Sequence, residues 1–411
     1  MSSVIKSAVK SLTEFPKRLN RRVKTIIVST GLLNWSQQQL TRQYNQLYAR
    51  SLGASSFEVG LLNGLSNAAS SLASLIVGWL IEQKGYKKVV LLGIICGITS
   101  AALFALAFKW WVLIPAFMLM NIIRIMPITD MIIVTYTPFK QRGLVMGFSR
   151  SFWGILNLSA PLFAAWMVTI FGGINAQGIR PLYYVQLILI LFAFFLVALR
   201  YPGREPSADK VEKVSTSEFI RSLKGLIIRN KSAKKWIILR CISFFSMSVS
   251  MPFIPIWMVE EKGATPYILG LTSTASIIVS MIAPILAGKL TDKLGRKKAY
   301  YILSPITYIG VIILILAPTS EYLILSGIFS GFQMTSFIPF ITMFWESVSA
   351  EERGKWYAIE GLVSSSMILS GIVGGIMWQL GLMVQVLILP VLLGALVMIP
   401  LLSTIPEVDE N

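Results

Sequence analysis

The chain has 411 residues, of which 55% are hydrophobic and only 14% charged, and its mean hydropathy is +0.70. A soluble domain carries about 25% charged residues, so this composition excludes an ordinary soluble protein. The net charge of +18 would suit a nucleic-acid-binding protein, but the basic residues lie between hydrophobic blocks, which argues against that partner. His is absent, which removes the commonest general base and metal ligand, and we expect no cofactor and no metal.

The first 24 residues form a basic segment ahead of the first hydrophobic block. Ile5, Val9 and Leu12 recur there at helical spacing among lysines and arginines. Two interpretations stay open, namely a short helix on an anionic membrane surface and a solvated tail. The segment is too polar to hold the apolar core of a cleavable signal peptide.

Twelve hydrophobic blocks follow, each close to the roughly 20 residues that cross a bilayer as a helix. The expected fold class is therefore an all-α membrane protein with 12 transmembrane helices. Most basic residues lie on the side of the N-terminus, and the positive-inside rule then places both termini in the cytoplasm of a multi-pass plasma-membrane protein. The expected spans are 25–49, 57–82, 88–108, 111–137, 142–170, 181–200, 235–258, 266–291, 298–318, 322–347, 353–380 and 383–404.

One long polar connection, 201–234, divides the chain into two six-helix bundles. The expected domains are a cytoplasmic basic segment 1–24, a bundle 25–200, the linker 201–234, a bundle 235–404 and a cytoplasmic tail 405–411. Within the linker, Ser215 to Glu218 forms a capping box ahead of an apolar stripe, which predicts an amphipathic surface helix.

An internal repeat relates the two bundles. A shift of 210 positions places Gly78 on Gly288, Glu82 on Asp292, Gly85 on Gly295, Gly53-Ala54 on Gly263-Ala264, and Lys87-Lys88 on Lys297-Lys298. A shift of 211 aligns Arg142-Gly143 with Arg353-Gly354. This predicts two parallel repeats related by an axis along the membrane normal.

The stretch from Gly288 to Lys298 reads GKLTDKLGRKK and resembles the loop motif G-x-L-x-D-[RK]-x-G-[RK]-[RK] of the major facilitator superfamily. The stretch from Gly78 to Lys88 is a weaker copy. Twelve segments, the central linker and the Arg-Gly pairs extend the resemblance over essentially the whole chain. The resemblance implies a permease that carries a small molecule through the lipid by alternating access, and we expect a monomer.

The resemblance also implies a cytoplasmic gate, because the loop acid of one half lies against a helix N-terminus of the other half. That N-terminus carries a partial positive charge. Asp292 would then face the start of segment five, and Glu82 the start of segment eleven. The alternative is that Asp292 only caps a tight turn. The residues expected in the gate are Gly288, Asp292, Gly295, Arg296, Gly78, Glu82, Gly85, Arg142 and Arg353.

Polar residues inside the segments predict the solute cavity, since ionisable groups in a membrane usually face a cavity or a partner. In segment one, Asn34, Gln38, Arg42 and Asn45 follow one stripe of a regular helix. The superfamily lines its cavity with segments one, four, seven and ten. The candidates are Asn34, Gln38, Arg42, Asn121, Arg124, Asp130, Arg240, Ser243 and Ser246.

Arginines outnumber acids within the segments, which favours an anionic solute if they face inward. They are Arg42, Arg124, Arg150 and Arg240, against Asp130 and Glu360. For Arg150 and Arg240 we expect snorkelling to the cytoplasmic interface. Asp130 is either a proton carrier or the partner of an arginine, and the serines of segment seven either line the cavity or pack helices.

The expected function is secondary active transport of a small organic solute, with coupling to a proton or another ion left open. An alternative is a multidrug or amphiphile exporter, although segment five lacks the glycine-rich pattern of such proton-driven exporters. An alternative of another class is a non-transporting sensor or lipid-modifying protein on this scaffold. No nucleophile-base constellation is visible, so we expect no enzyme activity.

Overall fold

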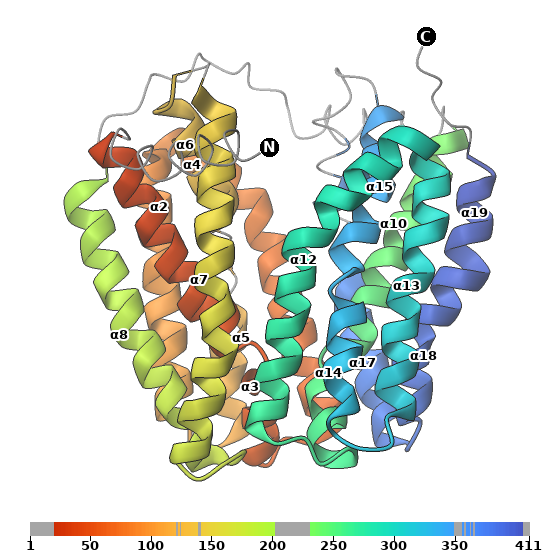
Figure 1. Ribbon diagram of the computed structural model, residues 1–411. Coiled ribbons are helices and arrows are strands. Elements are labelled where there is room, and N and C mark those ends of the chain that lie inside the picture. Colours follow the sequence, from red (N-terminus) through yellow and green to blue (C-terminus); the bar gives the residue numbers. More distant parts are fainter. Residues whose placement is uncertain are drawn as a thin grey trace, which may run out of the picture.

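The computed structural model describes residues 20–120, 122–123, 125–138, 141–201, 231–348, 356, 359–361, 363–364 and 366–405. Its helices form two groups that stand side by side (Figure 1). The amphipathic helix expected in the linker and most of the N-terminal basic segment lie outside the described residues. The expected domain boundaries therefore stay predictions.

The first group holds segments one to six. Segment one is broken into three helices, segments two and three both lie within α4 and are separated by a sharp turn at Gly85, and segment four is interrupted near its middle. The elements are α2 (Arg21–Leu33), η1 (Asn34–Leu40), α3 (Tyr44–Ser51), α4 (Ser56–Leu106), η2 (Trp110–Val112), α5 (Leu113–Met120), α6 (Ile125–Thr135), α7 (Arg142–Ile170) and α8 (Ala176–Arg200).

The second group repeats this order with segments seven to twelve. The elements are α10 (Lys231–Ser250), α11 (Ile254–Ile256), η4 (Trp257–Glu261), α12 (Pro266–Leu294), α13 (Arg296–Leu316), α14 (Tyr322–Ser330), α15 (Gln333–Glu346), α17 (Ser366–Gln379), α18 (Met383–Leu393), η5 (Gly394–Met398) and α19 (Ile399–Ser403). Within the described residues, nine helical stretches are long and apolar enough to cross a membrane. Segments one, two and eleven, which are not among these nine stretches, complete the twelve.

The predicted repeat is visible in the backbone of the two motif loops. Gly85 has φ 78° and ψ 160°, and Gly295 has φ 83° and ψ 162°. Only glycine adopts this region without strain. In both halves the glycine therefore turns the chain between two antiparallel segments, as the motif predicts.

Side-chain contacts follow the same repeat. Lys87 Nζ donates to the carbonyl of Tyr201, 3.2 Å away, after the end of α8, and Lys297 Nζ donates to the carbonyl of Ser403, 3.2 Å away, at the end of α19. A positive charge at a helix C-terminus is favourable because the last carbonyls lack backbone donors. The motif lysines thus attach each loop to the last segment of its own half.

We call the end of the molecule where α12 ends and α13 begins the motif face; the start of α2 and the end of α19 lie there too (Figure 1). The two halves contact each other toward the opposite face. A Cβ on Gly60 would lie 2.2 Å from the carbonyl oxygen of Gly371, and one on Gly270 would lie 2.9 Å from the carbonyl oxygen of Pro161. Such close backbone approach is typical of glycine-rich helix interfaces in membranes.

At the motif face the halves diverge. The ribbons of α7 and α12 separate toward that end (Figure 1), and a Cβ on Gly143 or Gly288 would meet nothing within 4 Å. Leu144 and Leu286 are 55% and 61% exposed there. The backbones of the two halves therefore lie farther apart at the motif face than at the opposite face.

The two glycines of the loop motif predict opposite effects of the same substitution. Gly295→Ala forces a Cβ into the positive-φ region, which costs on the order of 1–3 kcal/mol. Gly288→Ala is the matched control, because Gly288 lies inside α12 with open space around it and alanine favours a helix. Thermal unfolding of the purified protein in detergent should show a lower Tm for Gly295→Ala and an unchanged or higher Tm for Gly288→Ala. Equal Tm values for the two variants would contradict this role of Gly295.

Candidate functional site

Segment one does not continue as a regular helix. η1 has π-helical geometry and residues 41–43 leave the helix, so the regular stripe expected from the spacing is wrong. Asn34 Oδ1 accepts a hydrogen bond from Asn157 Nδ2 of α7 at 2.8 Å. Asn45 is 4% exposed and accepts from Tyr183 OH at 2.9 Å. Asn45 therefore joins helices within the first half.

Arg42 lies in the break of segment one and is exposed, as is Gln38 on the preceding turn. Within the described residues Arg42 forms no ion pair and no hydrogen bond. A break in a membrane helix removes backbone hydrogen bonds, which is tolerated where the chain borders an accessible space. Arg42 thus places a positive charge near the middle of segment one, where an anionic solute could bind it.

Asp130 of α6 and Arg150 of α7 form an ion pair. Arg150 Nη2 lies 2.6 Å from Asp130 Oδ2, and Arg150 Cζ lies 5.3 Å from the ring centroid of Trp153. Their side chains are 50% and 21% exposed for Arg150 and Asp130. Of the two roles considered for Asp130, this geometry gives it the partner role; a proton-carrier role stays untested.

Arg240 of α10 is buried and does not snorkel, contrary to our expectation. Its Nη2 lies 2.5 Å from Glu360 Oε1, and its side chain is 5% exposed. Aromatic rings of α10 and α15 surround its guanidinium. Because a lone charge in an apolar interior is very unfavourable, the Glu360 carboxylate is what allows Arg240 to stay there.

Two serines of segment seven contact neighbouring helices. Ser246 is buried, and its Oγ lies 3.5 Å from the carbonyl oxygen of Pro390 in α18. Ser248 accepts a hydrogen bond from Asn67 Nδ2 of α4 in the other half at 3.2 Å. Ser243 is partly buried. Asn121 and Arg124 lie outside the described residues, so their predicted place in the cavity stays a prediction.

The charges of the segments are therefore unevenly matched. Two of the four membrane arginines, Arg150 and Arg240, each have an acid beside them. Arg42 has none among the described residues, and Arg124 is not described. Fewer membrane arginines are therefore available to attract an anion than their number indicated, and among the described ones Arg42 is the candidate.

The predicted contact of Asp292 with α7 is not formed in this conformation. Asp292 is exposed, and it makes no ion pair or hydrogen bond with a described residue. Arg296 of the same loop pairs with Glu346 of its own half, Nη2 to Oε1 at 2.8 Å. The side chain of Glu82 and the surroundings of Gly78 are not described, and Arg353 lies outside the described residues. The gate motif therefore stays a prediction for the state in which the motif face is closed.

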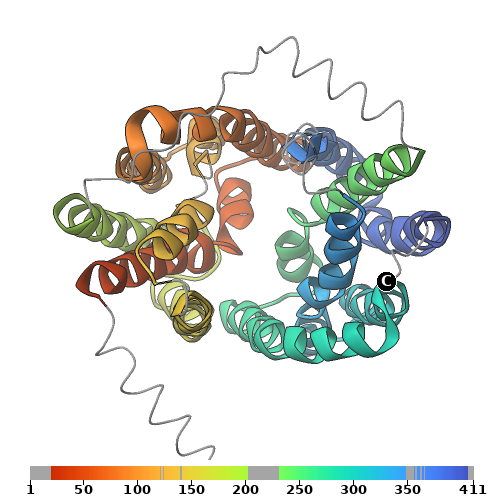
Figure 2. The same cartoon turned by 90° about the horizontal axis from the view of Figure 1, so that it is seen from above.

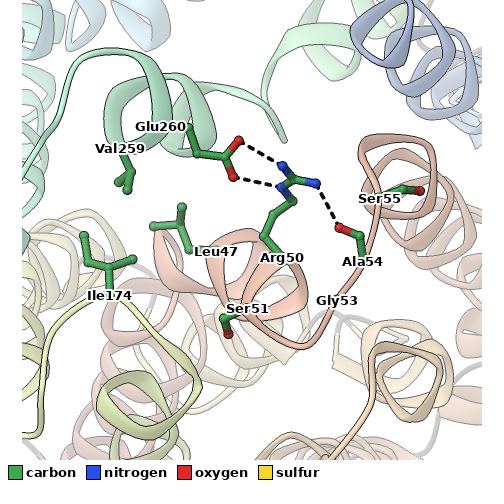
Figure 3. A pocket seen from close by; sticks show the side chains of 9 residues that line it. All are labelled: Leu47, Arg50, Ser51, Gly53, Ala54, Ser55, Ile174, Val259 and Glu260. Atoms are coloured by element: carbon green, nitrogen blue, oxygen red, sulfur yellow. Dashed lines mark hydrogen bonds and ion pairs between the residues drawn. The ribbon is translucent and has the colours of Figure 1, made fainter.

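At the opposite face, Arg50 and Glu260 form a two-point ion pair between the halves (Figure 3). Arg50 Nε donates to Glu260 Oε1 at 2.9 Å, and Nη2 donates to Oε2 at 3.0 Å. Arg50 Nη1 also donates to the carbonyl of Ala54 at 3.0 Å. The hydrogen bonds that Arg50 donates to the Glu260 carboxylate raise the pKa of Arg50, whose side chain is 30% exposed. Paired donors and acceptors of this kind fix orientation as well as distance.

The sequence contained a signal for this pair that we missed. Arg50 and Glu260 are 210 residues apart, which is the repeat shift, so the two ends of segments one and seven meet across the repeat axis with opposite charges. The pair borders a pocket of about 450 Å³. Its lining residues are Leu47, Arg50, Ser51, Gly53, Ala54, Ser55, Ile174, Val259 and Glu260 (Figure 3).

Seen from above, the helices of the two halves stand around a common axis (Figure 2). In the described part of the chain, no three acidic or cysteine side chains lie together so as to hold a metal ion. Cys96 and Cys241 are partly buried and form no disulfide with each other.

Comparisons with known proteins agree with this architecture. The family model described as Major Facilitator Superfamily matches residues 29–241 and 236–411. The chain is 24% identical over 288 residues to the cis,cis-muconate transport protein of Acinetobacter baylyi, covering 66% of this chain and 63% of that protein. It is 23% identical over 271 residues to the multidrug resistance protein MdtG of Proteus mirabilis, covering 61% and 62%. The chain thus spans less than two thirds of these two relatives.

Solved structures show the same fold at low sequence identity. The nucleoside transporter NupG superimposes with a TM-score of 0.73 at 12% identity, covering 93% of this chain and 99% of that one. A D-xylose-proton symporter superimposes with a TM-score of 0.66 at 13% identity, covering 94% and 97%. The predicted fold class of twelve membrane helices in two six-helix repeats is confirmed. The chain belongs to the major facilitator superfamily.

Proposed function

We propose that this protein is a secondary active transporter that moves a small organic anion across the plasma membrane by alternating access. The observation that carries the proposal is Arg42, an exposed guanidinium in the break of segment one without an acid beside it among the described residues. A cation at this depth is unfavourable unless it meets water or an anion. A carboxylate or phosphate would supply two acceptors to the planar fork of its donors.

The curated relatives support the substrate class. One of them transports cis,cis-muconate, and a dicarboxylate of that kind needs cationic donors in the cavity. A multidrug exporter is the second candidate, favoured by the similarity to MdtG. The anion transporter and the multidrug exporter differ in the role of Arg42. A guanidinium without an acid beside it would bind an anionic solute, but it would not stabilise a neutral or cationic drug.

Alternating access is supported by the asymmetry between the two faces. Tight glycine contacts and the Arg50–Glu260 pair join the halves at the opposite face, whereas the halves diverge at the motif face. The basic loops at the motif face favour the cytoplasmic side, which makes this conformation open to the cytoplasm. Opening to the other side then requires the Arg50–Glu260 pair to break and the predicted Asp292 contact to form.

Arg42→Ala should abolish exchange of organic anions. The test is counterflow of labelled cis,cis-muconate, with a panel of other mono- and dicarboxylates, in proteoliposomes. Arg42→Lys should lower the affinity about tenfold, because an ammonium lacks the two-point geometry. Lys109→Ala is the matched control, since it removes one exposed positive charge from a connecting loop. Anion exchange that persists in Arg42→Ala would contradict the proposed binding role.

Reversing the charge of Arg50 alone should destabilise the closed opposite face, and reversing the charge of Glu260 as well should restore it. Arg50→Glu places two carboxylates together and shifts the population toward the outward-open state. A partly exposed pair contributes about 1 kcal/mol, which corresponds to about a fivefold shift. Combining Arg50→Glu with Glu260→Arg restores the pair at positions related by the repeat. The readout is labelling of Ser51→Cys by an impermeant maleimide, in a background without Cys96 and Cys241. Equal labelling in the single and double variants would contradict the gate role.

Asp292→Asn should shift the protein further toward the cytoplasm-open state. The amide keeps the size of the side chain and removes the charge that would meet the α7 N-terminus when the motif face closes. Glu321→Gln, in an exposed loop at the other end of α13, is the charge-matched control. Cysteine accessibility and transport that both remain unchanged in Asp292→Asn would contradict the predicted contact.

A further inference from the structure

Segments three and nine end at equivalent positions of the repeat, because the 210-residue shift places Ala107 on Ala317. These two residues directly follow α4 and α13. Both are buried, at 0% and 4% exposure. A carbonyl group at a buried helix end has no partner within its helix, which is unfavourable unless a side chain or water donates to it. Each half therefore needs a donor at the same place.

A cation supplies this donor in both halves, but it comes from different segments. Arg180 Nη2 of α8 donates to the carbonyl oxygen of Ala107 at 2.7 Å. Lys262, which directly follows η4, donates from Nζ to the carbonyl oxygen of Ala317 at 2.9 Å. The repeat shift places Lys262 on the uncharged Leu52, so the two contacts are not copies of one another in the sequence. The same contact is thus reached by two different routes, which points to a requirement at this place in each half.

In the first half, this contact also holds the chain beside Arg50. Tyr48 lies two residues before Arg50 on α3. Its hydroxyl accepts a hydrogen bond from Arg180 Nε at 3.1 Å and donates to the carbonyl oxygen of Ala107 at 3.4 Å. The Tyr48 ring is buried, with its centroid 5.0 Å from that of Tyr183. Arg50 therefore extends from a helical turn that is bonded to the end of segment three.

In the second half, the contact holds the chain beside Glu260 in the same way. Lys262 lies two residues after Glu260, and its Nζ is 5.4 Å from the ring centroid of Trp257, the first residue of η4. Trp257 Nε1 donates to the carbonyl oxygen of Leu314 in α13 at 3.1 Å. Both ends of η4 are therefore attached to the end of segment nine, and Glu260 lies between them.

We propose that Arg180 and Lys262 are positioning residues for the Arg50–Glu260 pair, an inference that rests on the proposed alternating access. A two-point pair of arginine and carboxylate depends on orientation as well as distance. Holding two long side chains in one geometry costs conformational entropy, and a partly exposed pair gains little in return. The two cations hold both backbones against the ends of segments three and nine, so less ordering is left for the pair itself.

Loss of the Lys262 contact should make the opposite face open more often. The readout is the rate at which an impermeant maleimide, added at that face, labels Ser51→Cys of the other half in a parent without Cys96 and Cys241. Lys262→Met should raise this rate about threefold, below the effect of losing the pair itself. Lys262→Arg keeps a donor and should keep the parent rate. Lys109→Met is the matched control, since it removes an exposed charge from the loop after segment three. An unchanged rate in Lys262→Met would overturn the role of Lys262.

Tyr48→Phe tests the first half, because it keeps the buried ring and the contact of Arg180 with Ala107 and removes only the hydroxyl that links them to α3. The reporter is Val259→Cys, which borders the pocket from the other half. Its labelling rate should rise about twofold, as expected for the loss of one hydrogen bond. Arg180→Met also removes the donor to the helix end and should raise the rate further. The parent rate in either variant would overturn the role of Arg180.

A double-mutant cycle separates positioning from simple stabilisation of the helix ends. Once Arg50→Ala has removed the pair, Lys262→Met and Arg180→Met should cause no further rise in labelling, because residues that act through one interaction are not additive. Additive effects would overturn the inference. The cycle needs no solute, so its result does not depend on the identity of the cargo. If Arg50→Ala alone leaves labelling unchanged, the proposed gate itself fails. A rise in Arg50→Ala together with parent rates in both cation variants refutes the positioning role alone.

Discussion

The constraint on which this structure depends is that a charge inside the membrane must have a partner. Arg150 and Arg240 meet it with Asp130 and Glu360, at 2.6 and 2.5 Å. Arg50 meets it at the edge of the membrane with Glu260 of the other half. Arg42 is exposed and has no such acid among the described residues. Among the described membrane arginines Arg42 alone lacks an acid beside it, and this is the ground on which we propose an anionic cargo.

The internal repeat determines which of these charged residues can meet across the two halves. Equivalent positions of the two halves lie opposite each other across the repeat axis, so unlike charges at equivalent positions can attract directly. Arg50 and Glu260 do so, 210 residues apart. Gly85 and Gly295 give the two motif loops the same turn, and Lys87 and Lys297 attach each loop to the last segment of its half. Each half can therefore move as a unit while the contacts between the halves change.

Much of the fold could be predicted from the sequence, because spans, repeat and loop glycines depend on local chemistry and spacing. The twelve segments and the turn at Gly295 needed only hydropathy and one motif. The candidate site could be predicted less well. The stripe through Asn34, Gln38, Arg42 and Asn45 assumed a regular helix, and the π-helical turn with its break rotates Asn45 into the first half. Spacing cannot reveal such a break in a segment without proline.

Partners across segments were also beyond the sequence. Arg240 lies close enough to the motif face to snorkel, and only the packing of α10 against α15 and segment eleven shows that it is enclosed with Glu360. The Arg50–Glu260 pair could have been found, since the repeat shift places one charge on the other. The sequence alone did not show whether the equivalent ends of segments one and seven meet.

The central claim is that binding of an organic anion lets the motif face close and the opposite face open. Spin-label distances test it most directly in the reconstituted protein without Cys96 and Cys241, with Lys84→Cys and Lys293→Cys for the motif face and Ser51→Cys and Glu261→Cys for the opposite face. With saturating cis,cis-muconate and a proton gradient, the motif-face distance should shorten while the opposite-face distance lengthens. Distances that change on one face alone, or on neither face with any carboxylate of the panel, would contradict the claim.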